Sequence, residues 1–329
     1  MPLRAPPTAM HIVVFEAEPW EHASFESLRE DHQITFTDAP LTAENAGEFA
    51  RAEAISTFIY SELGGEVLSQ FPRLELIATR STGFDHIAGD YCREEGITVC
   101  NVPTYGSDTV AEHVFALLLA ISHNVVEAVD RTRRGDFSLT GLRGFDLRGK
   151  TFGVVGTGEI GRSVIRIAAG FGMDVLAQDI HPDREFANRH RFRYVSLDEL
   201  LETSDVVSLH VPLNRHTRHL LSYEQFDRMK EGAVLINTAR GDVVHTKALL
   251  RALADGTVAA AGLDVLPEEP TIREEAELLR SMFREEHDLE NLLADHVLLR
   301  MRNVIITPHS ACNTREAVER ILQTTVANI

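Results

Sequence analysis

The chain has 329 residues, of which 44% are hydrophobic and 7% aromatic. This length is about twice that of a usual domain and predicts two domains with buried cores. The 50 acidic and 32 basic side chains give a formal net charge of −18, and no Lys- or Arg-rich stripe reverses it locally. Phosphate backbones and anionic lipid would be repelled, so neither nucleic acid nor a membrane is an expected partner.

Location in the cytosol is also expected. The first ten residues hold three prolines and no apolar signal-peptide core, and no run reaches the ~18 apolar residues that span a bilayer. Cys92, Cys100 and Cys312 are odd in number and far from CxxC spacing, which predicts reduced, structural thiols.

The first hundred residues alternate short β-branched runs with helical patterns, which predicts a parallel sheet with helices on its faces. Gly83 follows the fourth run, at the carboxyl edge where open α/β sheets bind ligands. The strands are expected at His11–Phe15, Ile34–Thr37, Ala54–Tyr60, Leu74–Thr79 and Ile97–Cys100.

Between Ala111 and about Arg134 apolar residues recur every three or four positions, which predicts one long amphipathic helix between the domains. A second alternating series then predicts a larger doubly wound sheet. Ser222 with Gln225 forms an expected capping box, and Gly256 is expected to end a helix. The strands are expected at Thr151–Val155, Val175–Gln178, Val206–His210, Ala233–Asn237 and Val258–Leu263, with a last strand before Thr307 and a last helix over Arg315–Ile329.

A G-x-G-x-x-G turn, Gly156 to Gly161, follows the first strand of this second series and opens a helix. Gly156 permits the tight turn, Gly158 lets the backbone approach a pyrophosphate, and Gly161 lets helix pack on strand. Asp179 ends the next strand, where a carboxylate accepts hydrogen bonds from ribose hydroxyls and repels a 2′-phosphate. The order strand, glycine turn, helix, acid predicts a Rossmann domain that binds NAD, although Arg184 leaves NADP open.

Several side chains with acid–base or anion-binding chemistry follow later strands of the same series. Arg240 can clamp a carboxylate with two parallel hydrogen bonds, and His309 has a side chain suited to proton exchange near neutral pH. Asp264 and Glu269 follow another strand, and a nearby carboxylate fixes the tautomer of such a histidine. Each residue alone has an ordinary structural explanation, but their joint placement after a dinucleotide turn indicates an active site.

The remaining histidines are expected to be structural. His216 and His219 have a spacing found in metal sites, but no cysteine or carboxylate completes a set, so no metal is expected. His86 and His113 are interpreted as packed or hydrogen-bonded residues.

From His11 to Ile329 the chain resembles the D-isomer-specific 2-hydroxyacid dehydrogenase family, and more narrowly its D-lactate dehydrogenase branch. The motifs that carry the resemblance, besides the glycine turn, are Thr79-Arg80-Ser81-Thr82-Gly83-Phe84-Asp85-His86-Ile87, Asn101-Val102-Pro103-Thr104-Tyr105, Thr109-Val110-Ala111-Glu112-His113, His210-Val211-Pro212, Asn237-Thr238-Ala239-Arg240-Gly241, Gly262-Leu263-Asp264-Val265 and Thr307-Pro308-His309.

The resemblance implies a catalytic triad of Arg240, Glu269 and His309, with the substrate carboxylate also held by backbone N–H groups near Thr82 and Gly83. It implies a substrate contact from Tyr105. It further implies that NAD is bound by Gly156, Gly158, Glu159, Ile160, Gly161, Asp179, Val211, Pro212, Thr217, Thr238, Arg240 and Asp264, the last through the nicotinamide carboxamide.

The resemblance also implies a domain plan. Residues 1–105 and 309–329 would form a discontinuous, flavodoxin-like substrate domain, a lid that closes over a Rossmann NAD-binding domain of residues 106–308. Both domains would be doubly wound α/β units with parallel sheets, and a homodimer built on the connecting helix is usual in the family.

The expected activity is hydride transfer between NAD(H) and a small 2-oxo or 2-hydroxy acid of D configuration, with pyruvate and D-lactate first. Two alternatives stay open. Glyoxylate, hydroxypyruvate or a bulkier 2-oxo acid is the first, and an NAD-sensing interaction protein of the co-repressor kind is the second.

Overall fold

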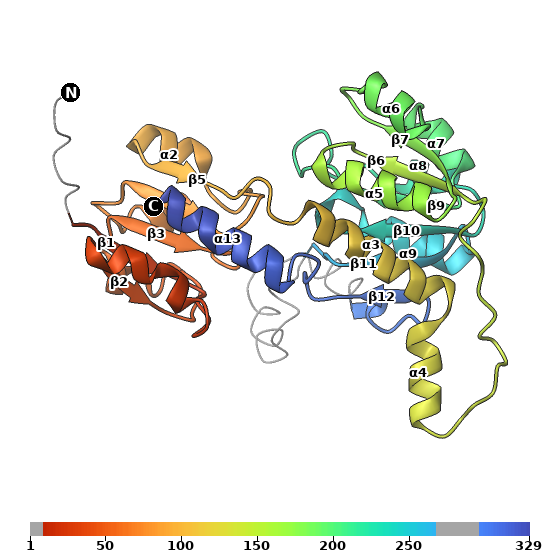
Figure 1. Cartoon of the computed structure of the whole chain (residues 1–329), viewed down its shortest axis with the longest axis horizontal. Coiled ribbons are helices and arrows are strands. Elements are labelled where there is room, and N and C mark those ends of the chain that lie inside the picture. The colour runs from red at the N-terminus through yellow and green to blue at the C-terminus, as the bar shows by residue number, and fades with distance from the viewer. Residues whose placement is uncertain (1–8, 268–295) are drawn as a thin grey trace. The chain divides into compact units, whose positions relative to one another are not determined.

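The structure is a computed structural model and describes residues 9–267 and 296–329. The chain forms two compact units: unit 1 is Met1–Tyr105 with Thr314–Ile329, and unit 2 is Gly106–Asn313. Each is built on one all-parallel sheet with helices packed against it, which confirms the predicted fold class (Figure 1). The boundary between the units falls after Asn313, whereas the sequence-based division was placed at His309.

Unit 1 contains a five-stranded sheet in the order β2-β1-β3-β4-β5, which is the flavodoxin-like order. Alternate residues of β1 point to opposite faces of the sheet, and both faces are buried. Val13 belongs to one apolar cluster, whereas Ile12 and Val14 belong to another, which also contains Leu322. Every strand predicted for this region is present. The elements are β1 (His11–Val14), η1 (His22–Glu30), β2 (Gln33–Phe36), η2 (Ala46–Phe49), β3 (Ala54–Thr57), α1 (Gly65–Leu68), β4 (Leu76–Thr79), α2 (Gly89–Glu95), β5 (Thr98–Cys100) and α13 (Arg315–Asn328).

Unit 2 contains a seven-stranded sheet in the order β12-β11-β10-β9-β6-β7-β8. The strand order reverses direction at β6 and β9, and such a switch point is where doubly wound sheets hold their ligands. The predicted strands are again present, and β8 is an addition too short to show a sequence pattern. The elements are α3 (Ser107–Ser122), α4 (Val125–Arg133), β6 (Thr151–Val155), α5 (Glu159–Gly170), β7 (Asp174–Gln178), α6 (Arg184–His190), β8 (Arg193–Tyr194), α7 (Leu197–Thr203), β9 (Val206–Leu209), α8 (Tyr223–Arg228), β10 (Ala233–Asn237), η3 (Gly241–Val243), α9 (Thr246–Asp255), β11 (Val258–Leu263) and β12 (Val304–Ile306).

The prediction of one continuous helix over 111–134 was wrong. The chain forms α3 and α4 with a bend of 60° between them, and Asn124 at the break has a φ of +51°. The cause is a later segment of chain, because Phe145 N–H donates to Ser122 O (2.9 Å) and takes an acceptor that a continuous helix would use itself. Asn124 Nδ2 donates to Leu142 O (3.3 Å) and fixes the same segment at the break.

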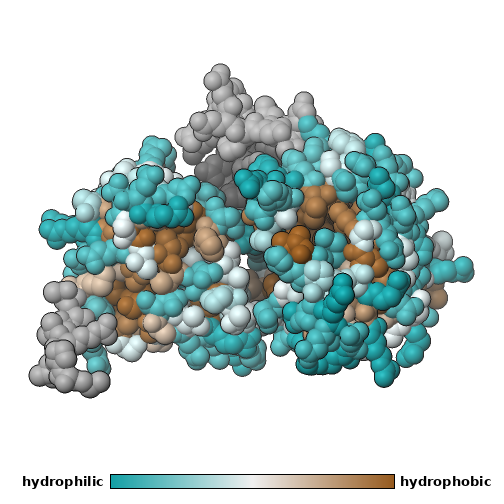
Figure 2. Space-filling model, turned by 90° about the horizontal axis from the view of Figure 1, so that it is seen from above, coloured by the Kyte–Doolittle hydropathy of each residue, from teal (hydrophilic) through white to brown (hydrophobic). Residues whose placement is uncertain are grey.

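Within the described ranges, no helix on its own has the length and apolar character of a membrane span. Only the bent pair α3 and α4 meets that test when taken together. The face of unit 2 and unit 1 seen in Figure 2 is largely hydrophilic, in keeping with the net charge of −18, with separate hydrophobic patches on each unit.

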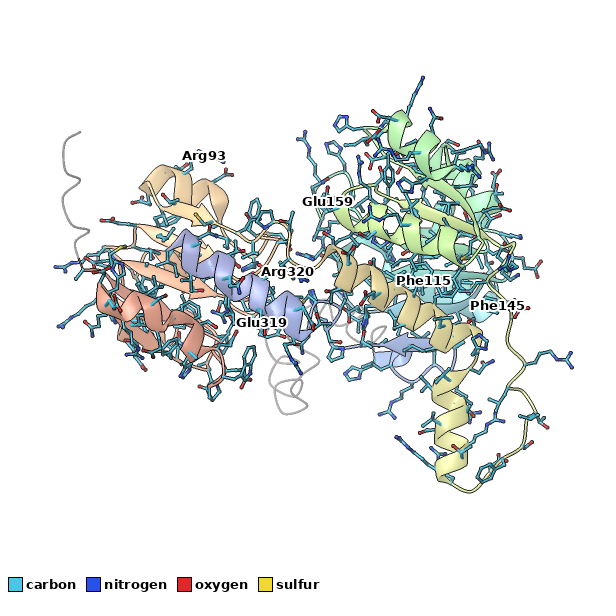
Figure 3. The ribbon with its side chains drawn as sticks, viewed as in Figure 1. Arg93, Phe115, Phe145, Glu159, Glu319 and Arg320 are labelled. Atoms are coloured by element: carbon cyan, nitrogen blue, oxygen red, sulfur yellow. The ribbon has the colours of Figure 1, made fainter. Side chains whose placement is uncertain are left out.

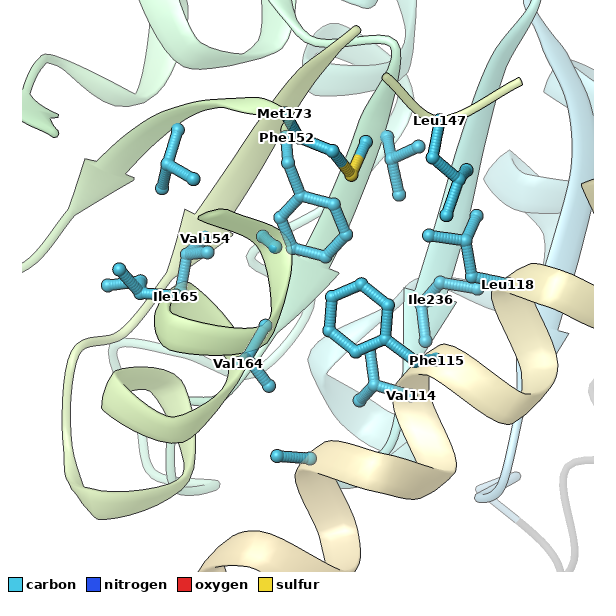
Figure 4. Close-up of a cluster of buried hydrophobic side chains, with 14 of the residues drawn as sticks. Val114, Phe115, Leu118, Leu147, Phe152, Val154, Val164, Ile165, Met173 and Ile236 are labelled. Atoms are coloured by element: carbon cyan, nitrogen blue, oxygen red, sulfur yellow. The ribbon is translucent and has the colours of Figure 1, made fainter. Parts of the chain in front are cut away.

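The core of unit 2 joins α3, α5 and the central strands (Figure 4). Phe115 of α3 stacks on Phe152 of β6, with ring centroids 5.6 Å apart and planes 15° apart. Gly262 in β11 lets α3 approach the sheet, because a Cβ there would lie 3.0 Å from the Cβ of Leu117 and 2.8 Å from Cδ1 of Ile236. Burial of each such side chain stabilises the unit by about 1.5–3 kcal/mol, so α3 is held firmly against the sheet.

The predicted helix ends are confirmed. Ser222 and Gln225 form a capping box at α8. Gly256 ends α9 in the left-handed region with a φ of +88°, which glycine adopts at little cost.

Candidate active site

The glycine turn lies between β6 and α5, at the switch point of the seven-stranded sheet. Gly156 has a φ of +94°, and a Cβ at Gly156 or Gly161 would approach backbone oxygens of His210 and Gly156, respectively, closer than 3.0 Å. A Cβ at Gly158, in contrast, would meet no heavy atom of the described residues within 4 Å. Gly158 is also the N-cap of α5, where no described side chain caps the helix. The turn therefore leaves open backbone and open N–H groups, which are the features that a phosphate-binding site requires.

Two sequence-predicted cofactor residues, Glu159 and Ile160, form the first turn of α5, and Figure 3 labels Glu159 at the helix start. Asp179 follows β7 and is hydrogen-bonded to the glycine turn. Its Oδ2 accepts hydrogen bonds from Thr157 N (2.6 Å) and Thr157 Oγ1 (2.8 Å), and its Oδ1 accepts one from His181 N (2.8 Å). Burial works to raise the pKa of Asp179, but these hydrogen bonds outweigh it and lower the pKa, so the carboxylate is ionised.

The loop after β9 holds three further predicted residues, Val211, Pro212 and Thr217. The Thr217 hydroxyl donates to Pro212 O (2.5 Å) and accepts from Asn214 N (2.9 Å), so it closes this loop. His210 opens the loop, with Nε2 2.8 Å from Ser208 Oγ. Burial lowers the pKa of His210 to about 3, so it is a neutral imidazole at physiological pH.

Arg240 projects from a turn that directly follows β10. The buried Asn237 side chain shapes this turn: its Nδ2 donates to Arg240 O (2.9 Å) and its Oδ1 accepts from Ala239 N (3.0 Å). Arg240 is half-buried, and its Nη1 donates to Ala239 O (2.8 Å). The buried hydroxyl of Thr238 has no hydrogen-bond partner in the part of the chain that the structure describes. An orphaned donor at this edge fits a bound polar molecule.

The segment that leads to Glu269 follows β11, which pairs with β10. A Cβ at Gly241 would meet the backbone of Leu266 and Pro267 closer than 3.0 Å, so the arginine turn and this segment are in direct backbone contact. Glu269 itself lies outside the described residues.

His309 follows β12, which pairs with β11, and β11 pairs with β10. Its backbone has a φ of +51°, a left-handed conformation that costs energy for a residue with a Cβ. Asp264, at the end of β11, holds this conformation: its O accepts from His309 N (3.0 Å), its Oδ1 from Ser310 N (2.9 Å) and its Oδ2 from Ala311 N (2.9 Å). The three adjacent strands β10, β11 and β12 are therefore followed, at one edge of the sheet, by Arg240, Asp264 and His309.

Asp264 is 1% exposed, and its carboxylate accepts from Thr307, Ser310 and Ala311 and lies 3.4 Å from His113 Nε2. Burial works to raise the pKa of Asp264, but hydrogen bonds from His113, Thr307 and Ala311 outweigh it and lower the pKa. The expected contact of Asp264 with a nicotinamide carboxamide stays a prediction.

The predicted substrate residues Thr82, Gly83 and Tyr105 belong to unit 1. The loop after β4 is held by its carbonyl groups: Thr82 O accepts from Asn101 Nδ2 (2.7 Å) and Gly83 O accepts from Ser81 Oγ (2.6 Å). Tyr105 O accepts from Nε of Arg320 (2.7 Å). Figure 3 labels Arg320 on α13. The C-terminal helix thus anchors the end of the unit that carries Tyr105.

Comparison with known proteins decides the family. Residues 115–311 match the model for the D-isomer specific 2-hydroxyacid dehydrogenase, NAD binding domain. The chain is 34% identical over 327 residues to D-lactate dehydrogenase of Escherichia coli, covering 97% of this chain and 96% of that protein. The chain belongs to the D-isomer specific 2-hydroxyacid dehydrogenase family. It is an NAD-dependent D-2-hydroxyacid dehydrogenase.

Two further relatives frame the substrate question. Glyoxylate reductase of Korarchaeum cryptofilum is 36% identical, with 84% of this chain and 78% of that protein covered. D-lactate dehydrogenase of Aquifex aeolicus, solved in complex with NAD and lactic acid, is 37% identical and superimposes with a TM-score of 0.85, covering 96% of this chain and 93% of that one.

The carboxyl edge of unit 2 fits NAD. Open backbone at Gly158, the uncapped start of α5 and the ionised Asp179 match the pyrophosphate and ribose of the cofactor. The sequence-based reading did not single out Thr157, which joins Asp179 to the turn, or Thr307, and it treated His113 as structural only. Thr307 and His113 lie within the quoted motifs, but no local pattern shows that they meet.

Proposed function

We propose that this dehydrogenase reduces a small 2-oxo acid, pyruvate first, to the D-2-hydroxy acid, with Arg240, Glu269 and His309 as its catalytic triad. The observation that carries the proposal is the arrangement of three adjacent strand ends, which present the Arg240 turn, Asp264 and a strained His309 loop at one edge. A guanidinium and an imidazole at the nicotinamide end of a Rossmann sheet are what 2-oxo acid reduction requires.

In this proposal NADH supplies the hydride that adds to C2 of the 2-oxo acid. Arg240 binds the substrate carboxylate through parallel N–H donors and orients its carbonyl. His309 donates the proton that the carbonyl oxygen takes up, so the product is a neutral hydroxyl and the imidazole is left uncharged. Glu269 would hold His309 protonated before the step and fix its tautomer.

Further contacts are proposed for the remaining predicted residues. On unit 1 the backbone near Thr82 and Gly83 and the side chain of Tyr105 would contact the substrate. On unit 2 NAD would be bound by Gly156, Gly158, Glu159, Ile160, Gly161, Asp179, Val211, Pro212, Thr217, Thr238, Arg240 and Asp264.

The choice among 2-oxo acids is the part of the function most in need of an experiment. A D-lactate dehydrogenase and a glyoxylate reductase both have identities in the middle thirties to this chain, so glyoxylate is the second candidate. The test is NADH oxidation with pyruvate, glyoxylate, hydroxypyruvate and 2-oxoisocaproate, ranked by kcat/KM, with chiral analysis of the product. We expect pyruvate to rank first and to give D-lactate; a higher kcat/KM for glyoxylate would reverse the assignment.

We also propose that the enzyme is a homodimer. Helix α4 and the segment after it expose several large apolar side chains, and exposed apolar surface on a charged protein is typical of an interface. Sedimentation of Val126→Asp/Phe137→Asp should show a monomer, whereas Leu299→Asp, another exposed apolar position, should leave a dimer. A wild-type monomer would refute the proposal. The exposed side chains are Val125, Val126, Val129, Phe137 and Leu139.

The two compact units would serve as a substrate domain and an NAD domain. Action in the cytosol likewise stays a prediction from composition and cysteine usage.

A further inference from the structure

A polar cluster lies next to the His309 loop in unit 2, with Asp264 buried and His113 and Thr307 half-buried. Its members come from three distant parts of the chain. His113 lies in α3, Asp264 follows β11, and Thr307 follows β12. His113 Nε2 is 3.0 Å from Thr307 Oγ1 and 3.4 Å from Asp264 Oδ1, and Thr307 Oγ1 is 2.5 Å from Asp264 Oδ1.

The hydrogen-bond chemistry of the cluster assigns the donors. An ionised carboxylate only accepts, so the Thr307 hydroxyl donates its single proton to Asp264. The hydroxyl can then only accept from His113, whose Nε2 must carry a proton. His113 therefore donates from Nε2 to Thr307 and to the carboxylate, and either protonation state with Nε2–H meets this need.

Asp264 connects this cluster to both sides of His309. Its carboxylate accepts from Thr307 on one side and from Ser310 and Ala311 N–H on the other, while its carbonyl accepts from His309 N–H. A positive φ at His309 is retained only while such bonds hold it, because the conformation is unfavourable in itself. Loss of a hydrogen-bond donor to Asp264 would therefore loosen the carboxylate that holds the His309 loop at its positive φ.

Helix α3 provides a firm base for His113. Its neighbours in the helix, Val114 and Phe115, are buried in the core of unit 2, and His113 is half-buried. The imidazole is thus placed by the packing of α3, and it reaches both Thr307 and Asp264 from there.

We propose that His113 is a positioning residue for hydride and proton transfer: through Thr307 and Asp264 it holds the His309 loop in its reactive conformation. The proposal rests on the proposed role of His309. His113 acts on the step that needs His309, so its removal should lower kcat and leave NADH binding intact.

The test compares His113→Leu, which removes the donor, with His113→Gln, whose amide Nε2–H reproduces it. With the best 2-oxo acid of the panel, His113→Leu should lower kcat roughly 10- to 100-fold, the range expected for a misplacement of about 1 Å. NADH affinity, measured by the fluorescence of bound NADH, should change less than about twofold, and His113→Gln should recover kcat to within about threefold of wild type. His123→Leu, an exposed histidine after the end of the same helix, should match wild type in both measurements.

A second variant keeps the test decisive if His113→Leu folds poorly. Thr307→Val removes the bridging hydroxyl, should lower kcat by a similar factor, and combined with His113→Gln should lose the rescue. A kcat for His113→Leu within about twofold of wild type, or equal losses for His113→Leu and His113→Gln in folded proteins, would overturn the role of His113. His309→Ala separates the two proposals, because near-normal turnover there would remove the proposed function itself.

Discussion

The carboxyl edges of the two parallel sheets are built in opposite ways. In unit 2 the edge consists of glycine backbone, an uncapped helix start and a carboxylate bonded to the turn. In unit 1 the corresponding edge is filled by the chain's own charges: Arg80 is 2% exposed, its Nη2 donates to Phe15 O and Glu16 O (both 2.8 Å), and its Nε is 3.8 Å from Glu21. The glycine turn of unit 2 leaves donors open for a ligand, whereas the donors of Arg80 in unit 1 join the ends of β1 and β4.

This contrast separates two kinds of effect. Changes at the edge of unit 2 should alter turnover or cofactor affinity, whereas changes at the charged edge of unit 1 should alter the stability of the fold.

The largest effect is expected from His309→Ala. Removal of the general acid should lower kcat by roughly 10² to 10⁴ while NADH affinity stays nearly unchanged. Stopped-flow NADH oxidation and NADH titration measure the two quantities. Turnover close to wild type would show that His309 is not the general acid. The carboxyl edge of unit 2 would then no longer be assigned a catalytic role that unit 1 lacks.

Arg80→Met should have the next largest effect, on stability. Breaking a buried ion pair leaves uncompensated charge, and the expected loss is about 3–5 kcal/mol of the free energy of unfolding. Arg93→Met is the matched control, because Arg93 forms its ion pair with Asp90 at the surface (Figure 3) and should cost less than about 1 kcal/mol. Urea denaturation of both variants gives the comparison, and equal losses would show that Arg80 has no special structural role.

The glycine turn allows a finer division within unit 2. Gly161→Ala would force a Cβ against Gly156 O and should destabilise the fold by about 1–3 kcal/mol. Gly158→Ala meets nothing among the described residues, so its melting temperature should match wild type. Its methyl group would occupy the space of the pyrophosphate, and NADH affinity should fall about tenfold or more, which corresponds to about 1.4 kcal/mol. Unchanged NADH affinity in folded Gly158→Ala would contradict the assigned cofactor position.

The sequence was enough to predict features whose signals are local. Strands of both sheets follow from apolar alternation, and the turn Gly156–Gly161 follows from its own spacing between a strand and a helix. The break between α3 and α4 was missed because it depends on Phe145, which returns to Ser122 from a distant segment.

The acid–base region was predictable only in its outline. Arg240, Asp264 and His309 follow predicted strands, so their common edge could be inferred, but no pattern places His113 against Thr307 and Asp264. The cluster of Arg80, Glu16 and Glu21 was likewise absent from the predictions, since its members come from separate segments: Arg80 follows β4, Glu16 follows β1 and Glu21 precedes η1.

The smallest expected effect concerns Glu16, a half-buried residue whose backbone O accepts from Arg80. Burial raises its pKa, and the bonds from Ser61 and Tyr60 and the charge of Arg80 only partly oppose this. A raised folded-state pKa means that the folded protein keeps this proton at a pH where the unfolded chain has released it. The contribution to the free energy of unfolding is then complete below the ordinary carboxyl pKa and is lost as pH rises through the folded-state pKa.

Glu16→Gln should remove this pH dependence. Its free energy of unfolding relative to wild type should increase as pH rises from about 4 to 7 and should be flat below that range. Glu127→Gln on α4 is the control of opposite sign, because the hydrogen bond from Arg131 lowers the pKa of Glu127 and wild type gains stability from it as pH rises. Urea denaturation at a series of pH values measures both differences. If the free energies of unfolding of the two variants, each relative to wild type, had the same pH dependence, the charges at the edge of unit 1 would be screened by solvent. The two sheet edges would then differ in composition but not in electrostatics.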